Sequence, residues 1–272
     1  MLTCKHDASV SMICRMAELL QKIKKLGVQL LTLRKCIKTE EDMRETLKNV
    51  KNIGYDSIYL NDGGSIYQQT VQLAKEAGLE IIGTAYDGKT LREEKARVLE
   101  NAALSGSYQV GIHKEVIHSA EGYAQFCEQI NEFGKILSQK QGKFIYNQHA
   151  REFCVMDGKK TGMDLLKEYT DPNVVSFGVN TFWLQNAGVD IRHFLEEYAG
   201  RIEILRMQDC TIAMDYFRQS LPLGSGNMYW DGIIEAAAEA GVAHYIVEDE
   251  KCLANILDVL EKSSQFIHEN YM

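Results

Sequence analysis

The chain has 272 residues and a net charge of −8, and 45% of its residues are hydrophobic and 25% are charged. Such values are ordinary for a soluble globular protein, and the length suits one large domain. The net negative charge, with no run rich in Lys or Arg, excludes a nucleic-acid interface of the usual basic kind. No run of about 18 apolar residues occurs, so we predict no transmembrane helix.

The cysteines and the N-terminus indicate a cytoplasmic protein. Seven cysteines are scattered along the chain with no CxxC pair, which predicts reduced thiols and neither a disulfide framework nor a zinc knuckle. Charged residues interrupt the segment Met1–Met16, so it lacks the apolar core of a signal peptide.

Residues 9–25 have apolar side chains at helical spacing, including Met12, Met16 and Leu19. This pattern predicts an amphipathic helix, which we assign to an N-terminal extension covering residues 1–25. We expect the helix either to cap one end of the domain that follows or to contact another copy of the chain.

From residue 26 onward, short apolar runs alternate with helical patterns. Strands are predicted at residues 27–33, 56–60, 79–84, 108–113, 143–149, 174–179, 201–207 and 243–248. Helices are predicted at residues 39–52, 66–77, 90–105, 119–141, 162–169, 189–198, 228–240 and 253–269. Thr39 is a predicted N-cap, and Gly54 is predicted to end the first of these helices.

Eight strand–helix units, repeating at roughly 25 to 35 residues, have the spacing that parallel βαβ units need. Residues 26–272 are therefore predicted to form a single α/β domain with the (β/α)₈ TIM barrel fold. An open, doubly wound sheet fits less well, because no G-x-G-x-x-G sequence opens the first helix.

In a TIM barrel the active site lies where the strands end at their carboxyl termini. The stretch FIYNQHAREF (144–153) places several polar side chains at one such strand end. The predicted strand ends carry Gln29; Tyr59 and Asn61; Ala85, Tyr86 and Asp87; His113, Lys114 and Glu115; Asn147, His149 and Glu152; Asn180, Thr181, Phe182 and Trp183; Arg206, Gln208 and Asp209; and Glu248, Asp249 and Glu250. These residues are polar or aromatic almost throughout, which favours a small polar ligand.

Several segments resemble one known family in matching order. They are GVQLLTLR (27–34), NIGYDSIYL (52–60), FIYNQHAREF (144–153), the run from residue 175 to residue 209, and PLGSGNMYWDGIIEAAAEAGVAHYIVEDE (222–250). Over about residues 26–265 the chain resembles the sugar phosphate isomerase/epimerase family. Its members are xylose isomerase-like TIM barrels, related to the inosose dehydratases and to the endonuclease IV group (AP endonuclease family 2).

The resemblance implies proton abstraction next to a carbonyl of a carbohydrate, at a divalent metal held by a Glu, an Asp, a His and a second Glu. Glu152 and Glu248 match the two Glu positions, but Asn180 stands at the Asp position and Arg206 at the His position. Other family positions are altered too, with Tyr59 for a Glu, Ala85 and Asn147 for His residues, and Ser225 for the Glu of PLGEG.

These departures disfavour a metal. Arg206 is a permanent cation without a lone pair, so bound Mn²⁺ or Mg²⁺, which Glu152 and Glu248 would hold, is not expected. Glu152, Glu248 and Arg206 together carry −1, the same formal charge as three carboxylates with one divalent ion. We therefore predict a metal-free site in which Arg206 takes the electrostatic role of the metal.

In this interpretation Glu152 and Glu248 act as base and acid, Arg206 stabilises the oxyanion, and His149 shuttles a proton. The predicted substrate-binding residues are Gln29, Tyr59, Asn147, Asn180, Trp183, Gln208, Asp209, Gly224 and Gly226. Among them, Trp183 would stack on a sugar face. The backbone N–H groups of Gly224 and Gly226 would hold a phosphate.

The predicted activity is that of a sugar, sugar-phosphate or cyclitol isomerase or epimerase. Two alternatives remain, namely a dehydratase or lyase and a non-catalytic carbohydrate-binding relative that has lost its metal. In the last case the Glu152–Arg206–Glu248 cluster would be a structural ion network. The predicted partner is a small carbohydrate, with a homo-oligomer compatible with the fold and neither nucleic acid nor membrane expected.

Overall fold

A computed structural model describes residues 22–113, 115–214, 217–249 and 255–272 of the chain. Eight parallel strands close into a barrel in the order β1-β12-β9-β8-β5-β4-β3-β2. They are β1 (Leu26–Gln29), β2 (Ser57–Asn61), β3 (Glu80–Tyr86), β4 (Val110–Ile112), β5 (Phe144–Asn147), β8 (Val175–Asn180), β9 (Ile202–Met207) and β12 (His244–Val247). The predicted (β/α)₈ TIM barrel is therefore confirmed.

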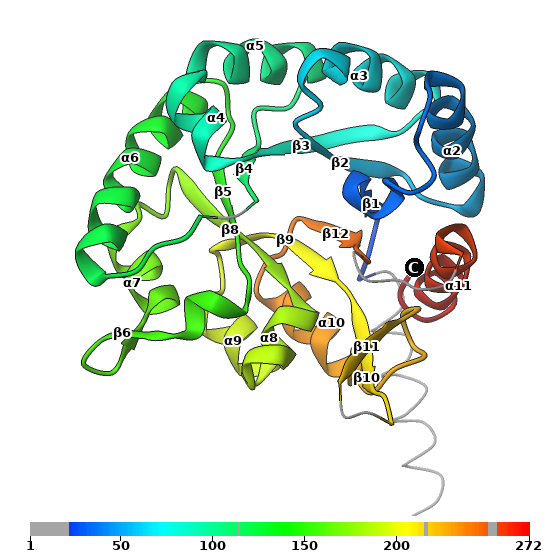
Figure 1. Cartoon of the computed structure of the whole chain (residues 1–272). Helices are drawn as coiled ribbons and strands as arrows, with labels where there is room; N and C mark the ends of the chain where they lie inside the picture. Colours follow the sequence, from blue (N-terminus) through cyan, green and yellow to red (C-terminus); the bar gives the residue numbers. More distant parts are fainter. Residues whose placement is uncertain (1–21, 114, 215–216, 250–254) are drawn as a thin grey trace, which may run out of the picture.

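Helices surround the ring of strands (Figure 1). They are α2 (Glu40–Ile53), α3 (Tyr67–Glu76), α4 (Gly88–Glu93), α5 (Lys95–Ser105), α6 (Ala120–Ser138), α7 (Gly162–Tyr169), α8 (Thr181–Ala187), α9 (Ile191–Glu197), α10 (Trp230–Glu239) and α11 (Ile256–Tyr271). Short 3₁₀ turns cover Leu30–Leu33, Gly64–Ile66 and Ala150–Phe153 (η3). Two antiparallel hairpins, β6 (Val155–Asp157) with β7 (Lys160–Thr161) and β10 (Asp209–Ile212) with β11 (Arg218–Leu221), lie outside the barrel sheet.

The ends of α2 follow from its sequence. Thr39 accepts a hydrogen bond from the N–H of Asp42, and the Asp42 carboxylate accepts one from the N–H of Thr39, which forms a capping box. Gly54 ends the helix with φ of 111°, a left-handed conformation that glycine adopts without a steric penalty. Both predicted helix boundaries are confirmed.

The main hydrophobic core lies between the strands and the helices, and a smaller cluster fills the barrel. That inner cluster consists of Tyr59, Ile82, Ala85, Ile145, Ile204 and Ile246. Glycines make room beside it, because a Cβ atom at Gly111 would overlap the Tyr59 hydroxyl and one at Gly178 would overlap the Asn147 side chain. Tyr59 and Asn147 therefore reach across the barrel interior just below the carboxyl ends of its strands. We call the region around these strand ends the barrel mouth.

Several details of the prediction were wrong or incomplete. The strand predicted at residues 27–33 ends at Gln29, because the chain turns into a 3₁₀ helix at the barrel mouth. The helix predicted at residues 90–105 is divided into α4 and α5, since Glu94 leaves the helical conformation. The short helix α8, which Asn180 caps, was missed. The β6–β7 hairpin was also missed, and so was the β10–β11 hairpin in what was predicted to be a loop.

Residues 1–21 of the predicted N-terminal extension lie outside the described residues. Residues 22–25 are not helical, which corrects the end of the predicted helix. Ile23 is buried and donates its N–H to the carbonyl of Tyr271 at 3.1 Å. The residues just before β1 thus pack against the end of α11. Within the described residues, no helix combines the length and apolar character needed to cross a membrane.

Candidate active site

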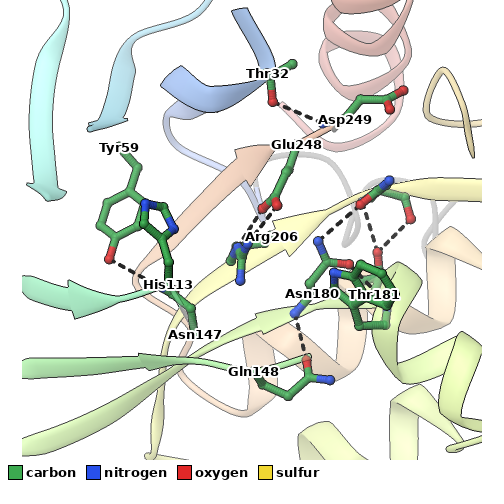
Figure 2. Close-up of polar contacts among 12 residues, drawn as sticks. Thr32, Tyr59, His113, Asn147, Gln148, Asn180, Thr181, Arg206, Glu248 and Asp249 are labelled. Atoms are coloured by element: carbon green, nitrogen blue, oxygen red, sulfur yellow. Dashed lines mark hydrogen bonds and ion pairs between the residues drawn. The ribbon is translucent and has the colours of Figure 1, made fainter. Parts of the chain in front are cut away.

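A buried ion pair lies at the barrel mouth. Arg206 on β9 donates from Nε to one oxygen of Glu248 at 2.5 Å and from Nη2 to the other at 2.6 Å (Figure 2). Each residue is only 1% exposed. The planar guanidinium suits a bidentate pair of this kind. Because both groups are buried, loss of either charge would leave the other buried without a partner. Together the two side chains are electrically neutral.

Amide side chains from neighbouring strands form a network beside this pair. Asn180 donates to Gln208 Oε1 at 3.2 Å, and its backbone N–H donates to Gln148 Oε1 at 3.1 Å. Asn147 donates to the hydroxyl of Tyr59 at 3.3 Å. The structure therefore brings three predicted binding residues, Tyr59, Asn147 and Asn180, to the mouth together with Arg206 and Glu248 (Figure 2). Gln208 joins them through its hydrogen bond to Asn180.

Four polar atoms at the mouth are buried and have no hydrogen-bond partner within the described residues. They are Gln29 Oε1, Asn61 Oδ1, Asn147 Oδ1 and His149 Nδ1. Buried polar atoms are usually satisfied by protein, water or ligand, and leaving one unsatisfied costs about 1–3 kcal/mol. Three of the four are amide oxygens, which accept hydrogen bonds. The mouth is therefore suited to a ligand that offers several donors.

Two histidines of the mouth lie in the field of the ion pair. His113 follows β4 and His149 follows β5. Burial, followed by the positive charge of Arg206, lowers the pKa of each imidazole from 6.5 to about 4. Both rings are therefore neutral at pH 7, and each offers one donor and one acceptor nitrogen.

The lowered pKa values of His113 and His149 lead us to predict that the folded protein loses stability in acid. The unfolded chain binds a proton at each imidazole below pH 6.5, whereas the folded chain does so only near pH 4. Stability therefore falls as the pH drops from about 6.5 to 4, by up to about 3 kcal/mol for each residue. Urea denaturation between pH 4 and 8 measures the loss, and His113→Gln and His149→Gln should each remove part of it. An unchanged pH profile in both variants would contradict the prediction.

Glu152 does not join Arg206 and Glu248, which corrects the predicted cluster. Its carboxylate accepts hydrogen bonds from the hydroxyl of Tyr146 at 2.8 Å and from the backbone N–H of His149 at 2.9 Å. The Tyr146 ring packs on Phe126 of α6, because successive side chains of β5 face opposite sides and Asn147 takes the inner one. Glu152 is thus held on the helix side of β5, where burial raises the pKa of its carboxyl.

Three predicted binding residues, Asp209, Gly224 and Gly226, are hydrogen-bonded to one another. The buried Asp209 carboxylate accepts hydrogen bonds from the backbone N–H groups of Cys210, Gly224, Gly226 and Met228 and from the indole N–H of Trp230. The two glycine N–H groups assigned to a phosphate are therefore bonded to this carboxylate. Asp209 organises the loop between β11 and α10.

Trp183 on α8 lies beside the site. Its ring centroid is 5.8 Å from that of His149 and 5.1 Å from that of Phe182. Phe182 is buried core, whereas Trp183 is half-buried, so stacking of Trp183 on a sugar stays a prediction. Glu115 pairs with Arg92 at 3.0 Å, and Lys114 lies outside the described residues.

The sequence placed Gln148, Thr181 and Asp249 at strand ends but did not reveal the contacts by which they hold adjacent strand ends together. Gln148 donates to the carbonyl of His149 at 2.7 Å and, as described above, bonds Asn180. The Thr181 hydroxyl exchanges hydrogen bonds with the backbone of Gln208, both at 2.9 Å, and Thr32 accepts from the N–H of Asp249 at 3.0 Å. Small hydroxyl and amide residues right after apolar runs were the available signal, but their partners are remote in sequence.

The side chains at the mouth do not fit the divalent metal that the family resemblance implies. Both oxygens of Glu248 bind Arg206, and Glu152 lies on the helix side of β5. Asn147 and Asn180 carry no charge. Among the residues that the structure describes, no group of three or more His, Cys, Asp or Glu side chains is placed to hold a metal ion.

Comparisons with known proteins agree on the fold. A sugar phosphate isomerase/epimerase from Parabacteroides distasonis superposes with a TM-score of 0.74 and 19% identity, over 90% of this chain and 94% of that chain. D-psicose 3-epimerase from Clostridium cellulolyticum H10 gives 0.67 and 15%, over 91% and 99%. The chain is thus a TIM barrel of the kind that these proteins share, and the predicted resemblance to the sugar phosphate isomerase/epimerase family is confirmed at the level of the fold.

In sequence, the chain is 26% identical over 175 residues to an inosose dehydratase from Geobacillus thermodenitrificans (strain NG80-2). The match covers 57% of this chain and 57% of that relative, so the chain spans little more than half of the curated relative's length. No protein-family model matches the chain.

Proposed function

We propose that the chain is an enzyme that isomerises or epimerises a sugar, a sugar phosphate or a cyclitol, by proton abstraction next to a carbonyl and without a metal ion. The observation that carries this proposal is the set of unpartnered buried atoms at the barrel mouth, namely Gln29 Oε1, Asn61 Oδ1, Asn147 Oδ1 and His149 Nδ1. The hydroxyl groups of a carbohydrate supply the missing donors. The similar fold of D-psicose 3-epimerase supports a carbohydrate ligand.

In the proposed reaction, His149 takes the proton from the carbon next to the carbonyl. The electron pair of the broken C–H bond forms a C=C bond, and the carbonyl oxygen becomes an oxyanion. The fixed positive charge of Arg206 stabilises that oxyanion. Glu248 orients the guanidinium through its two hydrogen bonds. His149 then delivers the proton to the former carbonyl carbon, while the proton of the neighbouring hydroxyl passes to the oxyanion. The electron pair of the C=C bond forms the new C–H bond, the carbonyl moves to the adjacent carbon, and the isomerisation is complete.

His149 takes the role of base because both Glu248 oxygens bind Arg206 and Glu152 faces the helices. A carboxylate that accepts from a guanidinium at both oxygens has both of them engaged and is not placed to take a proton from a substrate carbon. His149 Nδ1 is buried and has no partner among the described residues. The imidazole replaces the pair of carboxylates that the sequence alone suggested.

Hydrogen–deuterium exchange tests this activity. The protein is incubated in D₂O with neutral ketoses, keto-cyclitols and sugar phosphates, and replacement of the C–H next to the carbonyl is followed by proton NMR. We expect exchange with at least one compound, and His149→Gln should slow it by about 100-fold or more, the usual share of a general base. His193→Gln, at an exposed position of α9, is the control. Undiminished exchange by His149→Gln would exclude His149 as the base.

Elemental analysis tests the metal-free site. Protein purified without chelator, loaded with Mn²⁺ and desalted, should retain no stoichiometric metal, because Arg206 binds both oxygens of Glu248 and repels a cation. One equivalent of Mn²⁺ that disappears in Glu248→Gln would contradict the proposal. It would mean that Arg206 turns away from Glu248 in solution.

Two other functions are each favoured by one observation. The sequence similarity to an inosose dehydratase favours a dehydratase, which also begins with proton abstraction and is distinguished by loss of water from the product. The complete pairing of the Glu248 oxygens with Arg206 favours a carbohydrate-binding protein without activity. For such a protein, calorimetry would detect binding of a compound of the panel, and the exchange assay would show no replacement of the C–H protons of that compound.

A further inference from the structure

His113 is placed to contact the same ligand as His149. The backbone N–H of His113 donates to the carbonyl of Tyr86 at 2.9 Å, so the chain continues alongside β3 for one residue beyond β4. Gly111, two residues earlier, faces the barrel interior, because a Cβ atom added there would meet the side chains of Tyr59 and Asn147. Because side chains two residues apart on a strand share a face, the His113 imidazole also faces the inside, one layer nearer the mouth.

The neighbours of His113 determine which of its nitrogens carries the proton. The Asn61 side-chain nitrogen Nδ2 contacts His113 Nε2. If the Asn61 amide donates to Nε2, the proton of the neutral ring sits on Nδ1. Figure 2 shows the imidazole on the same side of the site as Tyr59 and the Arg206–Glu248 pair. The Asn61 side chain thus contacts the imidazole of His113, and in this tautomer Nδ1 is the donor of the ring.

The charges that face His113 keep it neutral. They are Arg206 on β9, Glu248 after β12, Asp87 at the start of α4 and Asp62 after β2. Asp62 is already paired with Arg97 at 2.9 Å, and Glu248 is paired with Arg206. Burial and Arg206 outweigh the acids, and the pKa of the imidazole is about 4. A neutral imidazole donates a hydrogen bond without transferring its proton, and so can polarise a carbonyl without becoming charged.

We propose that His113 touches the substrate and donates a hydrogen bond from Nδ1 to the carbonyl oxygen that becomes the oxyanion. His149 removes the proton from the adjacent carbon, the electron pair moves onto the carbonyl oxygen, and the His113 N–H and the charge of Arg206 stabilise it together. The proton of His113 stays on the imidazole throughout. His149 is restored when it delivers the abstracted proton to the former carbonyl carbon and the proton of the neighbouring hydroxyl passes to the oxyanion. This assignment rests on the proposed isomerase or epimerase activity and names a catalytic residue for it.

The experiment compares His113→Gln and His113→Asn with wild type in the deuterium-exchange assay, on each compound that the wild type exchanges. Loss of one oxyanion donor lowers kcat by about 10²–10³-fold, and we expect that loss with KM changed by less than about fivefold. His118→Gln, an exposed residue of the same loop, should match wild type. Thermal melting of each variant separates a catalytic loss from unfolding.

The outcomes separate the inference from the function on which it rests. If wild type exchanges no compound, the proposed activity fails and the role of His113 fails with it. If wild type exchanges a compound and both folded His113 variants do so at rates within about twofold, the activity stands and His113 is not the donor. A rise in KM with unchanged kcat would also overturn the proposal, because it would place His113 in ground-state binding alone.

Discussion

Arg206→Met should lower the free energy of unfolding by about 3–5 kcal/mol, because it leaves the carboxylate of Glu248 buried without its counter-charge. Both side chains are 1% exposed, so water cannot replace the guanidinium without opening the barrel mouth. Urea denaturation at pH 7 measures the change. Arg44→Met, which removes an exposed arginine paired with Glu76, is the control and should leave the midpoint nearly unchanged.

The double variant Arg206→Met/Glu248→Met makes this test sharper. Removing both charges eliminates the desolvation cost of the pair, and buried ion pairs replaced by apolar residues are often as stable as the original. We expect the double variant to regain most of the stability that the single variant loses, while both lack exchange activity. A double variant no more stable than the single one would show that the loss comes from packing and not from an unpaired charge.

Asp209→Ala should cost about 4 kcal/mol or more. Its carboxylate accepts five hydrogen bonds, from the N–H groups of Cys210, Gly224, Gly226 and Met228 and the indole of Trp230. Hydrogen bonds to a charged acceptor are worth about 1.5–3 kcal/mol each, and their buried donors would be left unsatisfied. Asp190→Ala is the control. It removes only the N-cap of α9, and should cost about 1 kcal/mol.

The Asp209 variant also tests whether the loop supports the site. Gln208 joins Asn180 to Ser220 of the β10–β11 hairpin, at 3.2 Å and 3.1 Å, and its backbone adjoins Asp209. Release of the loop should therefore weaken carbohydrate binding, which calorimetry measures on Asp209→Asn if the alanine variant does not fold. Unchanged stability in Asp209→Ala would mean that water replaces the carboxylate at this site.

The barrel was predictable because its signals are local. The barrel strands are short and mostly buried, as in β8, where all six residues are buried. Parallel strands covered on both faces read as nearly continuous apolar segments. Helix ends such as Thr39 and Gly54 depend on the residue itself and its near neighbours. The hairpin β10–β11 was missed, because its strands are polar, half-exposed and outside the barrel sheet.

The sequence predicted which strand ends form the site, but not the contacts among their side chains. The sequence correctly assigned Tyr59, Asn147, Asn180, Arg206 and Glu248 to the barrel mouth, since the C-terminal end of each strand is marked by its last apolar residue. It did not reveal that Glu152 turns to Tyr146 on the helix side, because a 3₁₀ turn separates it from β5. The family resemblance assigned Glu152 to a metal-ligand position, because matching residue types does not show that the 3₁₀ turn directs this side chain to the helix side.

By itself, the sequence determined the eight-fold alternation of strands and helices, most of their bounds and which residues end each strand. Only the tertiary structure decided the partners, with Arg206 bound to Glu248, the Gly224 and Gly226 amides bound to Asp209, and His113 placed beside Asn61. The physical reason is the distance along the chain over which each interaction acts. Periodicity and capping act within a few residues, whereas the direction of a side chain and the partner that satisfies its charge depend on strands that meet only when the barrel closes.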